Sequence, residues 1–223
     1  MTPRRIAILL GAVALAACNS PKASPPASEL GPAAPPGRAA ERAALGAPAP
    51  DFELRDLDGK PVKLSAFAGK IVVLEWFNPG CPYVQRAHAK GSLQGTGSRW
   101  DADPDVVWLA INSGAPGKQG HGVETNREAA ERFGIKHPVL LDESGVVGRK
   151  YGATNTPHMF VIDAKGVLVY AGAIDNSPDG EGESPSDGKL VRYVEQALEA
   201  VKAGRAVPVA KTEAYGCSVK YGS

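Results

Sequence analysis

Continuous apolar runs of strand length mark the centre of this chain and alternate with helical patterns. Residues 71–77 and 106–111 are almost wholly apolar, which is typical of strands buried on both faces of a sheet. The apolar stretch 159–162 leads through a glycine-containing turn into 167–174, so these two segments are predicted to form an antiparallel hairpin. Residues 138–141 predict one further, shorter strand.

Helices are predicted between and after these strands. Pro82 suits the first position of a helix. A second helix, over 125–133, is expected to be capped by Thr125 and to end at Gly134, and 145–151 predicts a shorter one. A final helix presents one apolar face made by Leu190, Val191, Val194, Ala197, Leu198 and Val201. This alternation predicts an α/β fold with a central mixed β-sheet and helices on both faces.

A β-hairpin extends this fold at its N-terminal end. Asp58-Gly59 is a strong turn signal, and it stands between two short segments of strand character, 51–54 and 61–63. The folded domain is therefore expected to span 49–223, including a C-terminal tail that carries Cys217.

The first 48 residues lack any such periodicity. Residues 1–17 begin with Arg4 and Arg5 and continue as an apolar stretch, which is the pattern of an export signal peptide. Residues 18–48 are rich in Pro and Ala and are predicted to form a tether outside any core. No apolar run reaches the roughly 18 residues that a membrane-spanning helix requires.

The end of the signal-like stretch, Leu15-Ala16-Ala17-Cys18, resembles the lipobox of bacterial lipoproteins. The resemblance implies that Cys18 is lipidated once 1–17 are removed, which anchors the domain to a bacterial membrane on its extracytoplasmic, periplasmic side. The alternative is a soluble secreted protein cut near Ala17. Either way, the domain is expected to work where disulfides persist.

Composition and charge exclude several classes of function. Lys and Arg number 25 against 24 Asp and Glu, a formal net charge of +1, so the basic excess of a nucleic-acid-binding protein is missing. The Gly-rich segment 115–120 lacks the phosphate-loop pattern, which argues against nucleotide binding. Three cysteines are too few for a disulfide framework and lack the spacing of a zinc site. No metal or organic cofactor is expected.

Two cysteines remain for chemistry after Cys18. Cys81 stands between Gly80 and Pro82 at a predicted helix start, where free N–H groups and the positive end of the helix dipole favour the reactive thiolate. The alternative is a buried, inert cysteine. Cys217 lies in a polar tail that spans up to about 45 Å when extended, enough to return across the domain. We therefore hypothesise that Cys217 resolves Cys81, the alternative being an unpaired surface thiol.

Several motifs resemble proteins of the thioredoxin fold. The run Trp76-Phe77-Asn78-Pro79-Gly80-Cys81-Pro82-Tyr83-Val84 resembles their redox turn, and Thr156-Pro157 resembles the cis-proline loop that faces the cysteine. Ala49-Pro50-Asp51-Phe52 and Asp58-Gly59-Lys60 resemble the redoxin, or alkyl-hydroperoxide-reductase/thiol-specific-antioxidant, branch. Over about 47–220 the chain is most similar to peroxiredoxin-like thioredoxin-family proteins with a single active-site cysteine.

The resemblance implies roles for particular residues. Cys81 is the nucleophile, and Val84 stands where thioredoxin has its second cysteine. Trp76 and Pro82 flank the nucleophile, and together with Thr156-Pro157 they are expected to contact a peptide substrate that pairs with the edge of the loop.

Glu75 is the one charged residue in the run 71–77. Thioredoxin has an acidic residue at the same spacing before its cysteine pair, where it relays protons. A raised pKa from burial would suit Glu75 to this role. The alternative is a glutamate at a strand edge that reaches solvent.

These expectations define a membrane-tethered, extracytoplasmic thiol–disulfide oxidoreductase that exchanges with a thiol or disulfide protein partner. A weak thiol peroxidase on the same residues is one alternative, although Leu74 and Asn78 stand where peroxiredoxins carry Pro and Thr or Ser. Another is a copper-binding module in which Cys81, Cys217 and His158 meet, since thiolates and imidazole suit copper. A redox-inactive adaptor domain is the last alternative.

Overall fold

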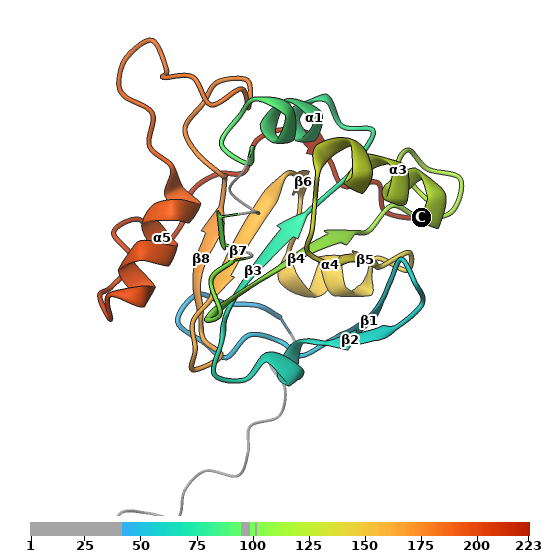
Figure 1. Ribbon diagram of the computed structural model, residues 1–223, viewed down its shortest axis with the longest axis horizontal. Coiled ribbons are helices and arrows are strands. Elements are labelled where there is room, and N and C mark those ends of the chain that lie inside the picture. Colours follow the sequence, from blue (N-terminus) through green and yellow to red (C-terminus); the bar gives the residue numbers. More distant parts are fainter. Residues whose placement is uncertain (1–41, 95–98, 101) are drawn as a thin grey trace, which may run out of the picture. The chain divides into compact units, whose positions relative to one another are not determined.

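The computed structural model describes residues 42–94, 99–100 and 102–223 (Figure 1). The signal peptide, Cys18 and the tether up to residue 41 lie outside the described residues. Seven strands form one sheet in the order β2-β1-β5-β4-β3-β7-β8. Their bounds are β1 Glu53–Asp56, β2 Pro61–Lys63, β3 Ile71–Trp76, β4 Val106–Asn112, β5 Val139–Leu141, β7 His158–Ile162 and β8 Leu168–Gly172.

Parallel and antiparallel pairs are combined in this sheet. The strand β3 runs parallel to β4, which runs parallel to β5, whereas β7 is antiparallel to β3 and β8 is antiparallel to β7. The predicted mixed sheet is thus confirmed, as is the N-terminal hairpin: β1 pairs with β2 around Gly59, whose positive φ of 78° suits glycine. Through β1 the hairpin also pairs with β5 and so extends the sheet.

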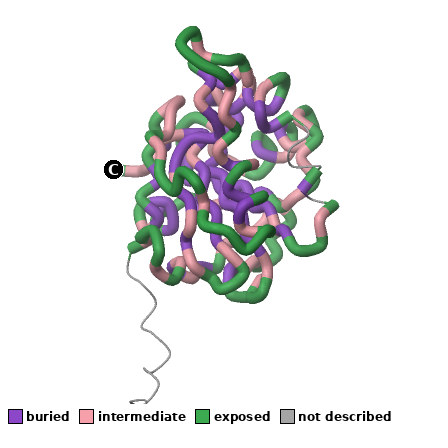
Figure 2. The backbone as a smooth tube through the Cα atoms, turned by 90° about the vertical axis from the view of Figure 1, so that its left-hand side faces the viewer, coloured by how far each residue is buried: buried purple, intermediate pink, exposed green. Residues whose placement is uncertain are grey.

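Helices cover both faces of the sheet. Their bounds are η1 Leu64–Phe67, α1 Pro82–Ala89, α3 Val123–Phe133, α4 Val146–Tyr151 and α5 Tyr193–Lys202. Residues of α4 and η1 pack with one apolar cluster, and residues of α1, α3 and α5 pack on the other side. Figure 2 shows the buried stretches gathered in the middle of the domain, with exposed stretches around them.

The burial of β3 explains its continuous apolar run. Val72, Leu74 and Trp76 belong to the cluster that contains α4, whereas Ile71 and Val73 belong to the cluster that contains α5. Because successive side chains point to opposite faces, a strand covered on both faces needs apolar residues at nearly every position.

Two predicted helix starts were wrong. The helix α3 begins at Val123 and has Gly122 as its N-cap, so Thr125 lies inside the first turn. The helix α5 begins at Tyr193. Val191 precedes it because its backbone N–H donates to the Asn176 side chain, an interaction of a loop. Apolar spacing alone did not reveal this competing bond.

The folded region begins before residue 49. Backbone N–H groups of Ala43 and Gly46 donate to the carbonyls of Lys150 and Leu168, at 2.9 and 2.8 Å, and Pro48 forms a β-bridge with Val167. The predicted boundary of the tether at 48 is therefore too late. Hydrogen bonds along one short segment hold it against the domain without any periodic apolar pattern.

The C-terminal chain returns across the domain after α5, which ends at Lys202. It crosses the view of Figure 1 between α5 and α3, just below α1, and forms the strand β9, Cys217–Ser218. This strand pairs antiparallel with β6, Asn155–Thr156, the segment that leads into β7. The tail thereby reaches the end of the sheet at which β3 gives way to α1.

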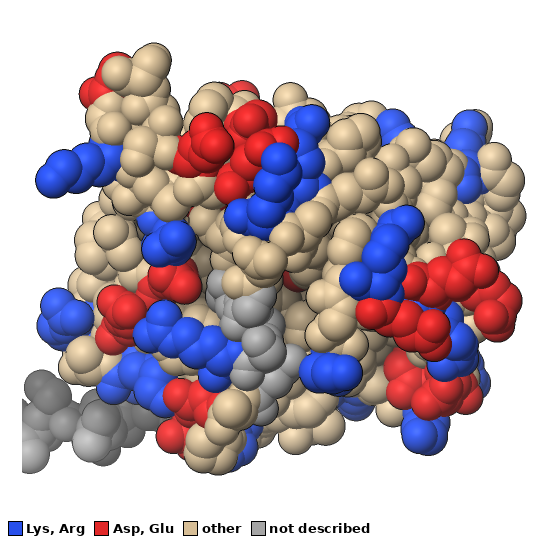
Figure 3. All heavy atoms as spheres, turned by 45° about the horizontal axis from the view of Figure 1, so that its top comes forward, with Lys and Arg blue, Asp and Glu red and all other residues tan. Residues whose placement is uncertain are grey.

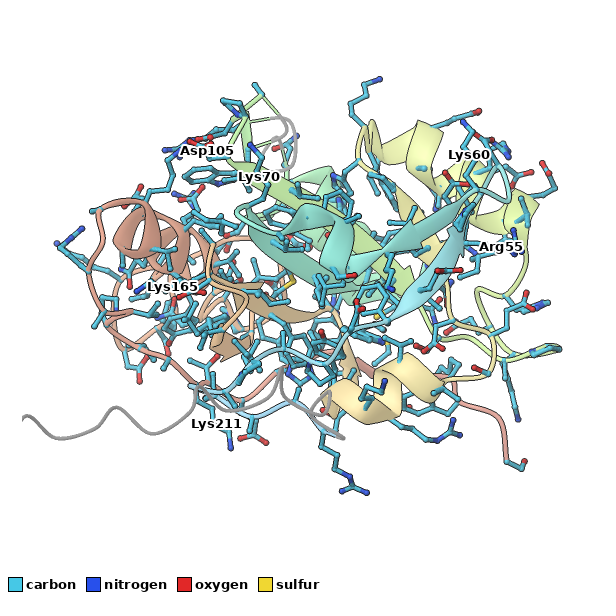
Figure 4. All side chains as sticks on the ribbon, turned by 90° about the horizontal axis from the view of Figure 1, so that it is seen from below. Arg55, Lys60, Lys70, Asp105, Lys165 and Lys211 are labelled. Carbon is cyan, nitrogen blue, oxygen red and sulfur yellow. The ribbon has the colours of Figure 1, made fainter. Side chains whose placement is uncertain are left out.

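The opposite end of the sheet carries ordinary surface charge. Figure 4 looks onto this end, where β3 and β4 begin, and labels Lys70 and Asp105, which form an ion pair at 3.7 Å. None of the helices in the described part of the chain is long and apolar enough to cross a bilayer.

Candidate active site

Cys81 is the N-cap residue of α1. A tight turn places it there: the Cys81 N–H donates to the Asn78 carbonyl at 3.0 Å, and the Gly80 N–H donates to the Asn78 side chain at 2.9 Å. Pro82 follows as the first helical residue, a position at which its missing N–H costs nothing. The predicted place of Cys81 at a helix start is confirmed.

The Cys81 side chain is fully buried, with 0% of its surface exposed. Its sulfur lies 3.0 Å from the Thr156 carbonyl oxygen, to which the protonated thiol donates. Burial was the property expected of an inert cysteine. Here, however, the C-terminal tail that covers Cys81 carries a second cysteine. A buried Cys81 can therefore still react with that thiol.

Cys217 lies on this cover. In the β6–β9 pair it stands directly opposite Thr156, and its side chain packs against the apolar cluster that contains Cys81 and Val84. Cys217 is half-buried, and both thiols are free. The C-terminal tail therefore brings together two cysteines that are 136 positions apart in the sequence.

The surroundings of the two thiols shift their pKa values in opposite directions. Burial raises the pKa of Cys81, but hydrogen bonds from the Cys217 thiol and from the backbone N–H groups of Val84 and Cys217 outweigh it, so its pKa lies below the ordinary 9.0. Burial and the adjacent Cys81 raise the pKa of Cys217 to about 11. In this arrangement a Cys81 thiolate accepts a hydrogen bond from a Cys217 thiol. The Cys81 thiol is therefore the stronger candidate nucleophile, and the Cys217 thiol is the candidate for the second attack.

A loop after β4 supports the turn before Cys81. The Gln119 side chain donates to the Gly80 carbonyl at 3.0 Å, and the Asn78 side chain donates to the Gln119 carbonyl at 3.3 Å. At Gly120, with a φ of 78°, an added Cβ would meet the Asn78 Oδ1 atom at 2.1 Å. The turn and the loop therefore hold each other in place.

Glu75 lies in the core of the protein and not at a solvent-exposed edge. Its carboxylate accepts from Trp108 Nε1 at 3.0 Å and contacts His88 Nε2 at 2.7 Å. Burial raises the pKa of Glu75, but the charge and hydrogen bond of His88, with smaller effects from His137 and Trp108, leave it below the ordinary 4.5. The expectation of a raised pKa is wrong, because the sequence did not reveal these partners.

The predicted substrate contacts differ in their surroundings. Pro82 is exposed beside Cys81, and the Thr156–Pro157 peptide bond is cis, as predicted. Trp76 is fully buried among Tyr151 and Phe160 and donates from Nε1 to Ser113 Oγ at 3.0 Å. A side chain in this position belongs to the core and has no surface to offer a substrate, so we do not retain Trp76 in the site.

His158 does not join the two cysteines. It stacks on Phe160 with ring centroids 4.5 Å apart, its Nδ1 accepts from the Thr154 N–H at 3.3 Å, and burial lowers its pKa to about 4. Within 42–94, 99–100 and 102–223, no group of three or more His, Cys, Asp or Glu side chains has an arrangement suited to a metal ion. The copper alternative therefore loses the ligand set on which it depended.

A comparison with protein families matches residues 44–188 to the Redoxin family model. The matched range covers well over half of the chain and includes Cys81 and the Thr156–Pro157 loop. The chain belongs to the redoxin family. The match ends before Cys217, so that cysteine lies in a C-terminal segment outside the matched range.

Relatives of this redoxin include thiol–disulfide oxidoreductases by name. Thiol-disulfide oxidoreductase ResA of Geobacillus thermodenitrificans is 33% identical over 131 residues, which are 55% of this chain and 66% of the relative, just under two thirds of its length. Peroxiredoxin Q of Triticum aestivum, a chloroplastic protein, is 28% identical over 132 residues, covering 54% of this chain and 55% of that protein.

Two solved structures resemble this redoxin over most of their length. A hypothetical protein from Sinorhizobium meliloti 1021 has a TM-score of 0.66 at 26% identity and covers 81% of this chain and 96% of its own. An uncharacterized conserved protein from Geobacillus kaustophilus also has a TM-score of 0.66, at 29% identity, covering 80% and 93%. Both support the thioredoxin-like fold.

Three residues make contacts around the site that the sequence did not indicate. Asn78 and Gln119 support the turn before Cys81, and His88 pairs with Glu75. His88 lies seven residues after Cys81 on α1, a spacing that places it two turns along the same helix. That spacing was the available signal, but no pattern identified a glutamate on β3 as its partner.

Proposed function

We propose that this redoxin is a thiol–disulfide oxidoreductase in which Cys81 attacks a protein disulfide and Cys217 resolves the resulting mixed disulfide. One observation carries the proposal: Cys217 stands opposite Thr156, whose carbonyl lies 3.0 Å from the Cys81 sulfur. The opposite pKa directions of the two thiols support the assignment of nucleophile and resolving cysteine. The names of the ResA relatives support the same class of reaction.

The exchange needs two thiolate attacks. The Cys81 thiolate attacks one sulfur of the substrate disulfide, a Cys81–substrate disulfide forms, and the other substrate sulfur leaves as a thiolate that takes up a proton. Cys217 then loses its proton and attacks the Cys81 sulfur, which releases the second substrate thiol. The substrate gains two electrons and the enzyme ends as a Cys81–Cys217 disulfide. A dithiol protein then reduces this disulfide, or the sequence runs in reverse to oxidise a substrate.

Location and anchoring form a separate part of the proposal. Residues 1–17 have the pattern of an export signal, and Cys18 follows the lipobox-like Leu15-Ala16-Ala17. We propose that the mature protein carries lipid on Cys18 and works on the periplasmic side of a bacterial membrane, with a thiol or disulfide protein as its partner. Labelling with a radioactive fatty acid tests this, since Cys18→Ser must abolish incorporation.

Mass spectrometry tests the cysteine pair directly. After mild oxidation and digestion without reductant, we expect a peptide containing Cys81 linked to one containing Cys217. Activity is measured as the turbidity that appears when insulin disulfides are reduced, or as the reduction of a peptide disulfide. Cys81→Ser should abolish exchange, and Cys217→Ser should accumulate the mixed disulfide. If both thiols are alkylated in oxidised protein that was never reduced, Cys217 does not resolve Cys81.

A weak thiol peroxidase is the second candidate on the same cysteines. The similarity to Peroxiredoxin Q and the lowered pKa of Cys81 favour it. In that reaction Cys81 is oxidised by peroxide to a sulfenic acid, and Cys217 condenses with it to the same disulfide and releases water. Stopped-flow loss of the Cys81 thiol on adding hydrogen peroxide separates the two functions: a rate no faster than that of a free thiol dismisses the peroxidase.

A further inference from the structure

The strand β9 occupies the edge at which a peptide substrate was expected to bind. It pairs antiparallel with β6, with Cys217 opposite Thr156 and Ser218 opposite Asn155. Side chains of β6 add two contacts to the tail backbone: Asn155 Nδ2 donates to the Gly216 carbonyl at 3.1 Å, and Thr156 Oγ1 donates to the Cys217 carbonyl at 3.4 Å. The tail therefore makes the backbone pairing that an extended foreign peptide would make by β-augmentation.

The pairing of β9 with β6 closes the site around Cys81 to outside substrates. Cys81 has no exposed surface, and a thiolate attacks a disulfide along the line of the S–S bond, which requires the incoming sulfur to reach it. With β9 in place, the Cys217 side chain packs against the cluster that contains Cys81, and its thiol donates a hydrogen bond to the Cys81 sulfur. An outside disulfide reaches the nucleophile only when β9 moves.

The tail is fastened on both sides of this short strand. Before it, the Tyr215 hydroxyl donates to Asp175 Oδ1 at 2.8 Å. After it, the Tyr221 hydroxyl donates to the Ala153 carbonyl at 2.7 Å, and the Arg149 guanidinium lies over the Tyr221 ring, 4.6 Å from its centroid. The pairing with β6 is only two residues long, and one further backbone bond joins the Val219 N–H to the Thr154 carbonyl at 3.0 Å. The two tyrosine hydroxyls are therefore among the contacts that hold the tail in place.

The backbone at residue 216 restricts what can occupy this edge. Gly216 has a φ of 102°, a conformation that residues with a Cβ rarely adopt. A Cβ added there would meet the Thr156 carbonyl oxygen at 2.3 Å and Pro157 Cδ at 3.3 Å. Any chain that follows the path of β9 past the Thr156–Pro157 loop therefore needs glycine immediately before its cysteine.

The charged side chains on this face do not indicate that substrates are recognised by their net charge. Figure 3 brings the end of the molecule around α1 toward the viewer and shows acidic and basic side chains side by side. Glu181, for example, pairs with Lys90 at 2.7 Å and with Arg86 at 3.9 Å. A mixed surface of this kind favours recognition by backbone pairing over recognition by the net charge of a partner.

We propose that β9 is an internal substrate mimic, and that a protein substrate enters as an extended segment with Gly before its disulfide-bonded Cys and replaces β9 on β6. This inference rests on the proposed oxidoreductase function. Release of the tail exposes Cys81, whose thiolate attacks the sulfur of the substrate cysteine. The other half of the substrate leaves as a thiol after gaining a proton. Return of β9 then delivers Cys217 to the mixed disulfide, so the same segment gates the first attack and performs the second.

The test uses the chain from residue 18 onward with Cys18→Ser and Cys217→Ser, so that Cys81 is its only thiol and the reaction stops at the mixed disulfide. Two nine-residue probes copy residues 213–221, one with the natural Gly-Cys and one with Ala in place of Gly. In each, the cysteine is activated as a mixed disulfide with thionitrobenzoate, whose release is coloured. The rate of release is measured for the parent, for Tyr215→Phe/Tyr221→Phe, and for Tyr151→Phe. The last variant is the matched control: it removes a tyrosine hydroxyl whose hydrogen bond, at 2.7 Å, goes to the Pro50 carbonyl and not to the tail.

We expect the loosened tail of the double variant to react about tenfold faster than the parent, because each lost hydrogen bond favours release. Tyr151→Phe should stay within about twofold of the parent, since a hydrogen bond outside the tail has no part in its release. On the parent protein the Gly-Cys probe should react at least about tenfold faster than the Ala-Cys probe. This second comparison needs no destabilised variant.

The failures are distinguishable. Equal rates for the double variant and the parent, or for the two probes, would overturn the substrate mimic while leaving the oxidoreductase in place. If no form of the protein reacts with either probe or with the small reagent dithiobis(nitrobenzoate), Cys81 is unreactive, and the proposed function falls with the inference.

Discussion

His88 Nε2 lies 2.7 Å from Glu75 Oε1 in the interior of the protein, and this pair ties α1 to the central strand β3. Cys81 begins α1, so the pair holds the helix whose first turn stabilises the thiolate. Both side chains are almost wholly buried, and removal of one partner leaves the other with an unsatisfied polar group in the core.

Glu75→Gln is therefore expected to lower stability more than it lowers reactivity. The buried His88 loses its ionised partner, and we expect the free energy of unfolding to fall by about 3 kcal/mol. Urea denaturation measures this change. His88→Gln and the double variant complete a thermodynamic cycle: because the two residues contact each other, the double variant should lose clearly less than the sum of the single losses. Additive losses would show that the pair does not act as a unit.

The same carboxylate is expected to make stability depend on pH. The pKa of Glu75 is lower in the folded protein than its ordinary value of 4.5. Its contribution to stability is therefore present in full above pH 4.5, and it is lost as the pH falls from there through the lower folded pKa. Denaturant titrations from neutral pH to pH 3 should show the difference between the parent and Glu75→Gln shrinking with acid. A constant difference across this range would contradict an ionised Glu75.

Much of the fold follows from local patterns. The run 71–77 predicted a strand because burial on both faces demands apolar residues throughout, and Gly80-Cys81-Pro82 predicted a helix start because proline is tolerated there. The cis bond before Pro157 came from the family resemblance, and the structure has it. Each of these features depends on a few adjacent residues, so a short stretch of sequence is enough to predict it.

The closed state of the site was beyond such reasoning. The β6–β9 pair has two residues on each strand, too few for any period to appear in the sequence. Cysteine count and tail length suggested that Cys217 returns to Cys81, but neither quantity says that it returns as a strand covering the Thr156–Pro157 loop. For Glu75, the sign of the pKa shift depended on His88, a partner that only the packed structure identifies.

The two thiols should influence each other's ionisation in a measurable way. A hydrogen bond from Cys217 is among the contacts that lower the pKa of Cys81, so Cys217→Ala should move the pH profile of Cys81 alkylation by iodoacetamide to higher pH. Conversely, Cys81→Ala should lower the pKa of Cys217 from about 11 toward 9.0, because the adjacent charge is removed. Ultraviolet absorbance of the thiolate follows both titrations. Profiles that stay unchanged in the two variants would mean that the thiols are not in contact in solution.

Asn78 is expected to position the turn that presents Cys81. Its side chain accepts from the Gly80 N–H at 2.9 Å and donates to the Gln119 carbonyl at 3.3 Å. Asn78→Ala removes both bonds, and we expect a loss of about 1–2 kcal/mol in stability together with a slower attack of Cys81 on a peptide disulfide. Asn78→Asp separates the two contributions, because it keeps the acceptor for Gly80 and loses the donor to Gln119. If the acceptor sets the turn, Asn78→Asp recovers most of the exchange rate although its hydrogen bond to the Gln119 carbonyl stays broken. Equal rates for Asn78→Ala and Asn78→Asp would show that the bond to the Gln119 carbonyl matters more.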